Sequence, residues 1–241
     1  MSPHLERNRS GAPLLRPRAL RRYGDAAGLV NIAAALAAAL ALVLASPAAA
    51  PAAAPPRILV LGDSLTAGFG LPAGEAIPAR LQARLAAAGV AAEVINGGVS
   101  GDTSADGLAR LDWAMADHPD AVLVELGAND ALRGIDPKLT YANLDRILAR
   151  LTASGVKVML IGMLAPANWG RDYQREFDAI YGRLAAKYHV PLYPFLLDGV
   201  AMDPALNQAD GLHPNARGAE IIAGKLEPLV ARLIGDKGAA G

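Results

Sequence analysis

The chain alternates between short runs of apolar residues and longer stretches in which apolar residues recur every third or fourth position. Short apolar runs indicate buried strands, and the longer spacing indicates helices with one face against a core. The predicted strands are residues 57–61, 90–95, 121–126, 156–161 and 190–193. The predicted helices are residues 77–88, 104–115, 141–153, 173–188 and 214–233. Strands that alternate with helices predict an α/β fold, a parallel sheet with helices on both faces.

Two of the predicted helix boundaries carry local signals. Gly89 follows the first helix, at a position where a left-handed backbone favours glycine as a cap. Pro214 stands at the start of the last helix, where proline is suited to the first turn because that N–H has no partner. We therefore expect the last helix to begin at Pro214.

Residues 1–55 precede this pattern and have the layout of a secretory signal. Arginines outnumber acidic residues in residues 1–25, an apolar run covers about residues 26–45, and small residues then lead into an alanine- and proline-rich linker. This order indicates a signal peptide, cleaved within residues 48–54. The apolar run is also long enough to remain as an uncleaved anchor. We expect one domain at residues 56–236 and export to the periplasm or the medium.

The composition narrows the classes of function. Lysine and arginine together number 23, as do aspartate and glutamate, so no basic surface and no nucleic-acid partner are predicted. The chain has no cysteine, which excludes disulfides, a cysteine nucleophile and thiolate metal sites. No two histidines have the spacing of metal ligands. We expect no metal and no cofactor, and the sequence indicates no obligate protein partner.

In a parallel α/β fold the working groups gather at the carboxyl ends of the strands. Ser64 directly follows the first strand, in Gly-Asp-Ser-Leu, where a helix cap explains a serine equally well. Asp210 and His213 precede the last helix; the histidine can accept a proton and the aspartate can orient it. The alternative is that Asp210 caps the helix and His213 is a surface residue. His118 and His189 precede strands, so we expect them to be structural.

Two further segments follow the second and third strands. Residues 96–103 form a glycine-rich turn in which Gly101 permits close approach of backbone N–H groups to an anion. Asn129, in Gly-Ala-Asn-Asp, would present an amide donor beside Ser64. Each segment taken alone is explained as a turn. With Ser64 and His213 they place a nucleophile, donors and a base at one edge of the sheet, which predicts acyl transfer.

Four motifs stand in the order of the blocks of the SGNH (GDSL) hydrolases: G-D-S-L, the glycine of S-G-D-T-S, G-x-N-D and D-x-x-H. The chain resembles this family over about residues 58–230. It is most similar to the bacterial periplasmic acyl-CoA thioesterase/lysophospholipase, or arylesterase, branch, and the supporting stretches are residues 96–111, 122–134, 164–170 and 210–218. The resemblance implies a three-layer α/β/α fold of flavodoxin-like type with a five-stranded parallel sheet.

The resemblance also implies roles for particular residues. Ser64 would be the nucleophile and Asp210 and His213 the orienting acid and the base. The oxyanion hole would comprise the N–H groups of Ser64 and Gly101 and the side chain of Asn129. The substrate would be a small-molecule or lipid acyl ester or thioester, cleaved through an acyl-enzyme without a cofactor.

The loops after the fourth and fifth strands supply candidate substrate contacts. These are Leu164, Trp169 and Phe195, with Met163, Leu196 and Leu206 as further candidates, although for any one of them a core or rim position is the favoured explanation. Two other functions stay open at this point: a carbohydrate O-acetylesterase with the same four blocks, and a non-catalytic binding protein of the cell envelope. Acyl length and the preference between ester and thioester do not follow from the sequence.

Overall fold

The computed structural model describes residues 34–36 and 54–235. The chain divides into two units, residues 1–53 and 54–241, and the strands of the sheet all belong to the second. The predicted signal peptide, its cleavage site and the alternative anchor lie outside the described residues, apart from the short helical stretch 34–36. Within the described ranges, no helix has the length and apolar character needed to cross a bilayer.

A sheet of five parallel strands forms the centre of the second unit, in the order β2-β1-β3-β4-β5. The strands are β1 (Arg57–Gly62), β2 (Glu93–Gly98), β3 (Ala121–Glu125), β4 (Lys157–Ile161) and β5 (Leu192–Tyr193). Leu59 of β1 pairs with Ile95 on one side and Val122 on the other, so the chain order reverses around β1. The predicted parallel sheet is confirmed.

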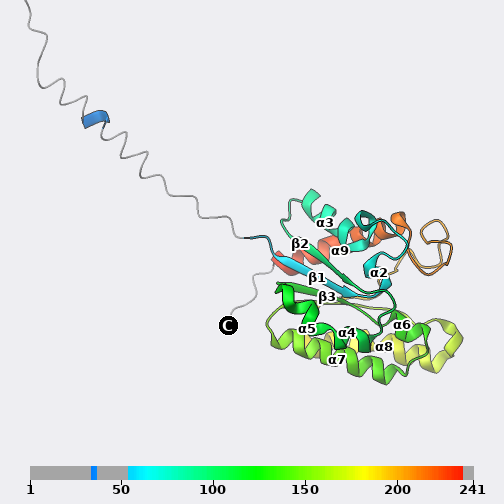
Figure 1. Cartoon of the computed structure of the whole chain (residues 1–241). Helices are drawn as coiled ribbons and strands as arrows, with labels where there is room; N and C mark the ends of the chain where they lie inside the picture. The colour runs from blue at the N-terminus through cyan, green and yellow to red at the C-terminus, as the bar shows by residue number, and fades with distance from the viewer. Residues whose placement is uncertain (1–33, 37–53, 236–241) are drawn as a thin grey trace, which may run out of the picture. The chain divides into compact units, whose positions relative to one another are not determined.

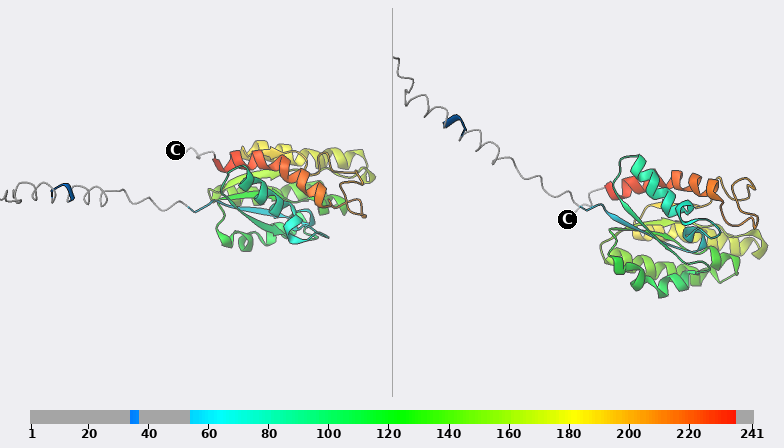
Figure 2. Two further views of the ribbon diagram at one scale, coloured as in Figure 1. Left: turned by 90° about the horizontal axis from the view of Figure 1, so that it is seen from above. Right: turned by 45° about the horizontal axis from the view of Figure 1, so that its top comes forward.

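Helices cover both faces of the sheet, as Figure 1 shows. One face carries α3 (Ile77–Ala87) and α9 (Ala216–Gly235), which lie side by side in Figure 2. The other face carries α4 (Ser104–Ala109), α5 (Leu111–Ala114), α7 (Pro137–Ala153) and α8 (Arg171–Tyr188). Short helices lie in the loops: α2 (Ser64–Ala67), α6 (Ala128–Leu132), and the 3-10 turns η1 (Ala73–Glu75), η2 (Met115–Asp117) and η3 (Ala167–Trp169). The three-layer arrangement expected from the resemblance is confirmed.

The core lies between the sheet and these two helical layers. The central strands are buried on both faces, which explains why they read as continuous apolar runs rather than as alternating ones. In α7 the apolar residues at helical spacing are buried on one face, among them Leu144, Leu148 and Leu151. Tyr181 of α8 is buried as well, and its hydroxyl donates to the carbonyl of Leu126 at 2.9 Å. Burial raises the pKa of Tyr181 well above its usual value, so it stays a donor.

Two predicted boundaries are shifted by local hydrogen bonds. The strand predicted at residues 90–95 begins at Glu93 because the N–H of Val90 donates to the carbonyl of Leu85 and closes α3. Gly89 has φ +74°, as expected for the cap. The helix predicted at 141–153 begins at Pro137, because the Asp136 side chain accepts from the N–H of Lys138 at 2.9 Å.

Two other predictions about helices are wrong. The helix predicted over residues 104–115 breaks at Arg110, which has ψ 7° and separates α4 from α5. The last helix begins at Ala216 rather than at Pro214. The Asn215 side chain accepts from the N–H groups of the next turn, at 2.9 and 3.1 Å, and Pro214 instead forms an isolated antiparallel bridge with Asn207.

Candidate active site

Ser64 stands directly after β1, at the carboxyl edge of the sheet, and opens the single turn α2. The turn is defined at both ends by its own residues. The Asp63 carboxylate accepts from the N–H of Leu65 at 2.9 Å, and Gly68 ends the turn with φ +78°. This local geometry holds Ser64 at the open end of the sheet.

Asp210 and His213 lie in the loop that leads from β5 to α9. One carboxylate oxygen of Asp210 accepts from the N–H groups of Leu212 and His213, at 2.9 and 3.0 Å. The other lies 2.6 Å from Nδ1 of His213. The backbone N–H and the side chain of His213 lower the pKa of Asp210 to about 2, so the carboxylate is ionised at neutral pH. The alternative in which Asp210 caps the last helix is therefore wrong.

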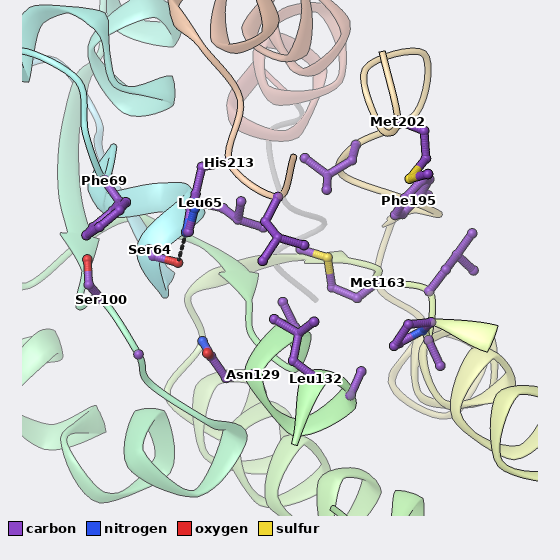
Figure 3. Close-up of a pocket in the computed structure, with 18 residues that line it drawn as sticks. Ser64, Leu65, Phe69, Ser100, Asn129, Leu132, Met163, Phe195, Met202 and His213 are labelled. Atoms are coloured by element: carbon purple, nitrogen blue, oxygen red, sulfur yellow. Dashed lines mark hydrogen bonds between the residues drawn. The ribbon is translucent and has the colours of Figure 1, made fainter. Parts of the chain in front are cut away.

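The decisive contact joins the two ends of the domain. Nε2 of His213 lies 2.9 Å from Oγ of Ser64, although the residues are 149 positions apart (Figure 3). An ionised Asp210 favours the tautomer with the proton on Nδ1, which leaves the Nε2 lone pair facing the hydroxyl. The predicted serine, histidine and aspartate therefore form one hydrogen-bonded chain.

Gln208 ties the loop of His213 to the loop that follows Ser64. Its side-chain amide donates to the carbonyl of Phe69 at 2.7 Å and to that of Pro214 at 3.0 Å. Its backbone N–H donates to the carbonyl of His213 at 2.8 Å. The ring of Phe69 lies 4.7 Å from the imidazole, centroid to centroid. Gln208 thus holds the backbone of His213 in place, and the ring of Phe69 covers one side of the imidazole.

The predicted donors lie on the opposite side of Ser64. Within the described residues, the N–H groups of Ser64 and Gly101 donate to no protein acceptor. Gly101 has φ +90°, a conformation that favours glycine. The Asn129 amide, which Figure 3 shows turned toward Ser64, donates to the carbonyl of Asp102 at 2.9 Å and reaches Asp63 at 3.3 Å. Ser64, Gly101 and Asn129 all line one cavity.

Two buried carboxyl groups lie beneath Ser64. Thr66 donates to Oε2 of Glu125 at 2.6 Å, and the same oxygen lies 3.4 Å from the N–H of Asp63. Burial raises the pKa of Asp63 to about 6, and burial together with the charge of Asp63 raises the pKa of Glu125 well above its usual value. Burial and the neighbouring carboxyl therefore favour the neutral form of Glu125. The sequence analysis missed it, although an acid within an otherwise apolar run was a visible signal.

A cavity of about 640 Å³ opens beside Ser64 and His213. Its lining is predominantly apolar. The side chains that contribute are Leu65, Phe69, Ala128, Ala131, Leu132, Met163, Leu164, Ala165, Pro166, Phe195, Leu197, Met202 and Leu212. Figure 3 shows Leu132, Met163, Phe195 and Met202 arranged along it, leading away from Ser64. The cavity has the size and lining of a site for a mainly apolar small molecule.

Only some of the candidate substrate contacts line the cavity. Leu164, Phe195 and Met163 line the cavity. Trp169 does not: its indole N–H donates to the carbonyl of Ala131 at 2.8 Å, and its ring lies over Gly134. Leu196 and Leu206 are core residues.

No group of three or more histidine, cysteine, aspartate or glutamate residues in the described ranges is arranged to hold a metal ion. His118 and His189 lie away from the site, as expected. Each histidine ends a helix in the left-handed backbone conformation, with φ 49° for His118 and 54° for His189. Each stands shortly before the amino end of a strand.

A protein-family model described as the GDSL-like Lipase/Acylhydrolase family matches residues 60–221. The chain is a GDSL-like acylhydrolase. The matched segment includes Ser64, Gly101, Asn129, Asp210 and His213. The hydrolase predicted from the four motifs is confirmed, and membership of this family makes the protein an enzyme that hydrolyses ester bonds.

Relatives of this acylhydrolase agree in sequence and in fold. Thioesterase 1/protease 1/lysophospholipase L1 of Escherichia coli (strain K12) is 43% identical over 178 residues, which cover 72% of this chain and 84% of the relative. An arylesterase of Vibrio mimicus is 42% identical over 168 residues, 69% of this chain and 84% of the relative. The crystal structure of AlinE4, an SGNH-hydrolase family esterase, is 46% identical with a TM-score of 0.63, covering 74% of this chain and 96% of that one.

Proposed function

We propose that this acylhydrolase cleaves small-molecule carboxylic esters and thioesters through an acyl-enzyme on Ser64. The observation that carries the proposal is the chain of contacts at 2.9 and 2.6 Å from Ser64 through His213 to Asp210, beside an apolar cavity. A hydroxyl in contact with an imidazole whose other nitrogen faces a carboxylate is an activated nucleophile.

The reaction then has two halves. Oγ of Ser64 attacks the acyl carbon while Nε2 of His213 takes its proton, and the carbonyl oxygen becomes an oxyanion. The tetrahedral intermediate collapses, and His213 gives its proton to the departing alcohol or thiol. Water, deprotonated by His213, attacks the acyl-enzyme in the same way and releases the acid and the free serine. Asp210 stays ionised and stabilises the imidazolium in both halves.

The N–H groups of Ser64 and Gly101 and the amide of Asn129 would bind the oxyanion. Donors that stand ready where negative charge develops lower the barrier without rearrangement at the moment of reaction. The unpaired state of the first two N–H groups supports this role. The contact of Asn129 with Asp63, at 3.3 Å, is long enough for the oxyanion to compete for that hydrogen.

The apolar cavity supports an acyl chain longer than acetyl as the preferred substrate group. Its volume of about 640 Å³ greatly exceeds what a methyl group fills, which disfavours a carbohydrate O-acetylesterase. The relatives named as a thioesterase, a lysophospholipase and an arylesterase support esters and thioesters alike, since one acyl-enzyme serves every leaving group. No cofactor takes part in these steps, and no nucleic-acid or protein partner is required.

The order of positive, apolar and small segments in residues 1–55 supports export to the periplasm or the medium. Expression of the full chain in a bacterium, cell fractionation and sequencing of the mature N-terminus test this. A protein that begins within residues 48–54 and leaves the cytoplasm is expected. Full-length protein in the cytoplasmic fraction would contradict export, and full-length protein in the membrane fraction would favour the anchor.

A fluorophosphonate probe together with a panel of p-nitrophenyl esters tests the activity. The wild-type protein should react covalently with the probe, the Ser64→Ala variant should not, and kcat/KM should be higher for octanoyl than for acetyl ester. Equal labelling of both proteins would refute the assignment of Ser64. A rate that is greatest for acetyl would instead favour the acetylesterase.

A further inference from the structure

Arg110 lies at the break between α4 and α5, and its side chain reaches back to the carboxyl edge of the sheet. Nε donates to the Asp102 carboxylate at 2.5 Å, and Nη2 donates to the carbonyl of Gly62 at 2.9 Å. The side chains of Arg110 and Asp102 are only 16% and 11% exposed. Charge-assisted hydrogen bonds that are shielded from water are stronger and more exact in geometry than surface ion pairs.

The two acceptors belong to the segments that carry the N–H donors of the site. Gly62 ends β1, two residues before Ser64, and its carbonyl also accepts from the N–H of Val99 at 3.0 Å. Asp102 directly follows Gly101. The backbone carbonyl of Asp102 is also the acceptor that holds the Asn129 amide at 2.9 Å. The Arg110 guanidinium therefore connects the end of β1 with the loop that follows β2. Through Asp102 it is also connected to Asn129 of α6.

We propose that Arg110 is a positioning residue for the oxyanion hole, one that touches no substrate but sets the relative placement of Ser64, Gly101 and Asn129. The inference rests on the proposed function, because it assumes that these three groups bind an oxyanion. It assigns a role to the helix break at Arg110, which lets the side chain leave the helix toward the sheet edge.

Lysine cannot replace arginine in this arrangement. The guanidinium is planar and directs separate N–H groups at a carboxylate and at a backbone carbonyl, whereas an ammonium group is a single donor atom. In Arg110 two nitrogens serve the two segments, and Nη1 is buried with no partner in the described part of the chain. A lysine would keep the charge, but its single nitrogen would not reproduce the two separate donor positions of the guanidinium.

Loss of the Arg110 contacts should slow the chemical step of the reaction. Oxyanion donors act only when they lie about 2.7–3.1 Å from the developing charge, and a misplacement of about 1 Å can cost about 100-fold in rate. Binding of the acyl chain depends on the apolar cavity, and Arg110 does not line that cavity. Loss of the bridge should therefore lower kcat and leave KM nearly unchanged.

The first experiment compares Arg110→Lys with Arg84→Lys, using p-nitrophenyl butyrate. Arg84 of α3 is a matched control, because it forms an ion pair with Glu220 at 2.7 Å on the helical face away from the site. Arg110→Lys should lower kcat about 10- to 100-fold with KM within about 2-fold of wild type. Arg84→Lys should keep both values. Thermal unfolding of each variant shows whether the fold is retained.

The second experiment separates positioning from general destabilisation. In an Asn129→Ala background, Arg110→Lys should cost clearly less than it does in the wild type, because one of the three groups that Arg110 positions is already missing and the effects of coupled residues do not add. Millimolar guanidinium chloride should restore part of the kcat of Arg110→Ala and have no effect on Arg84→Ala. If the Arg110 variants do not fold, Asp102→Asn should reproduce the loss of kcat with KM unchanged.

Wild-type kcat in Arg110→Lys would overturn the proposal, as would a full additive loss in the Asn129→Ala background. A proportional change in KM would do the same, because it would indicate altered ground-state binding. Failure of the proposed function itself looks different. In that case the wild-type protein would not react with a fluorophosphonate, or Ser64→Ala would keep its activity, whatever Arg110 does.

Discussion

On the side of Ser64 that faces β1, β2 and β3, the polar groups are buried, and Asp63 and Glu125 are 0% and 1% exposed. On the side that faces α9, the Asp210 side chain is 37% exposed. The same residue type behaves in opposite ways on the two sides. Burial raises the pKa of Asp63 to about 6, whereas hydrogen bonds from its own loop lower the pKa of Asp210 to about 2.

The N–H donors and the Asp210–His213 pair are therefore held in place by different kinds of contact. The N–H donors depend on contacts between strands that are distant in sequence, such as those of Asp102 and Asn129. The acid–base pair depends on a short loop whose contacts are mostly local, with Gln208 as a link to the loop of Phe69. Changes on the buried side should therefore affect stability and rate together, and changes in the exposed loop should affect rate alone.

The largest loss is expected where the two sides meet. Ser64→Ala or His213→Ala should lower kcat roughly 10⁴- to 10⁶-fold, because either change removes the activated nucleophile. Hydrolysis of p-nitrophenyl butyrate by variants purified from a host with no background esterase measures this. A Ser64→Ala protein with half the wild-type rate would show that the hydroxyl is not the nucleophile.

Asp210→Asn should cost somewhat less, about 10³- to 10⁴-fold in kcat, because an asparagine amide favours the wrong tautomer of His213. The melting temperature should stay within about 2 °C, since the side chain is partly exposed and its local oxygen acceptor is retained. Kinetics and thermal unfolding on one preparation test both statements. A drop of 10 °C would show that the exposed loop supports the fold as well as the chemistry.

Asn129→Ala should lower kcat about 10²- to 10³-fold through the loss of one oxyanion donor. The melting temperature should also fall, because the carbonyl of Asp102 loses its partner in a largely buried position. The measurement is kcat with KM, together with thermal unfolding. An unchanged kcat would remove Asn129 from the oxyanion hole and would place the donors elsewhere.

The smallest effect on activity is expected from Glu125→Gln, whose readout is stability against pH. Because its pKa is raised, the folded protein holds the Glu125 proton more tightly than the unfolded chain does, so this group makes stability fall as pH rises above about 4.3. Glutamine resembles the protonated acid, so the variant should match wild type at pH 4 and exceed it at pH 8. Denaturant titrations at the two pH values decide, and a variant less stable than wild type at pH 8 would contradict the assignment.

The sequence was sufficient to predict the strands, the layers and the residues of the hydrogen-bonded chain. Ser64 and Asn129 follow buried apolar runs, and Gly101 follows the partly exposed edge strand β2. Parallel strands bring their carboxyl ends to one edge whatever the details of packing. Asp210 and His213 share one short loop, so their mutual approach is a local property. Motifs tied to strand ends were therefore predictable before any contact was known.

Side chains whose roles depend on three-dimensional packing were not predictable. Trp169 lies in the expected loop, but its indole N–H donates to the carbonyl of Ala131, and its side chain does not line the cavity. Phe69 and Met202 line the cavity from irregular loops, and Leu132 lines it from the short helix α6, none of which carries a clear periodic pattern. The side chain of Arg110 donates to the carbonyl of Gly62, 48 positions away, and helical spacing alone gave no sign of this contact.

The 149 positions between Ser64 and His213 also bear on when activity can begin. The imidazole lies beyond β5, so Ser64 has no base until the segment that carries His213 returns to the carboxyl edge of the sheet. Closure of so long a loop is a late and slow event in folding. A nascent or partly folded chain therefore has a serine but no base, and ester cleavage starts only once the whole domain is complete.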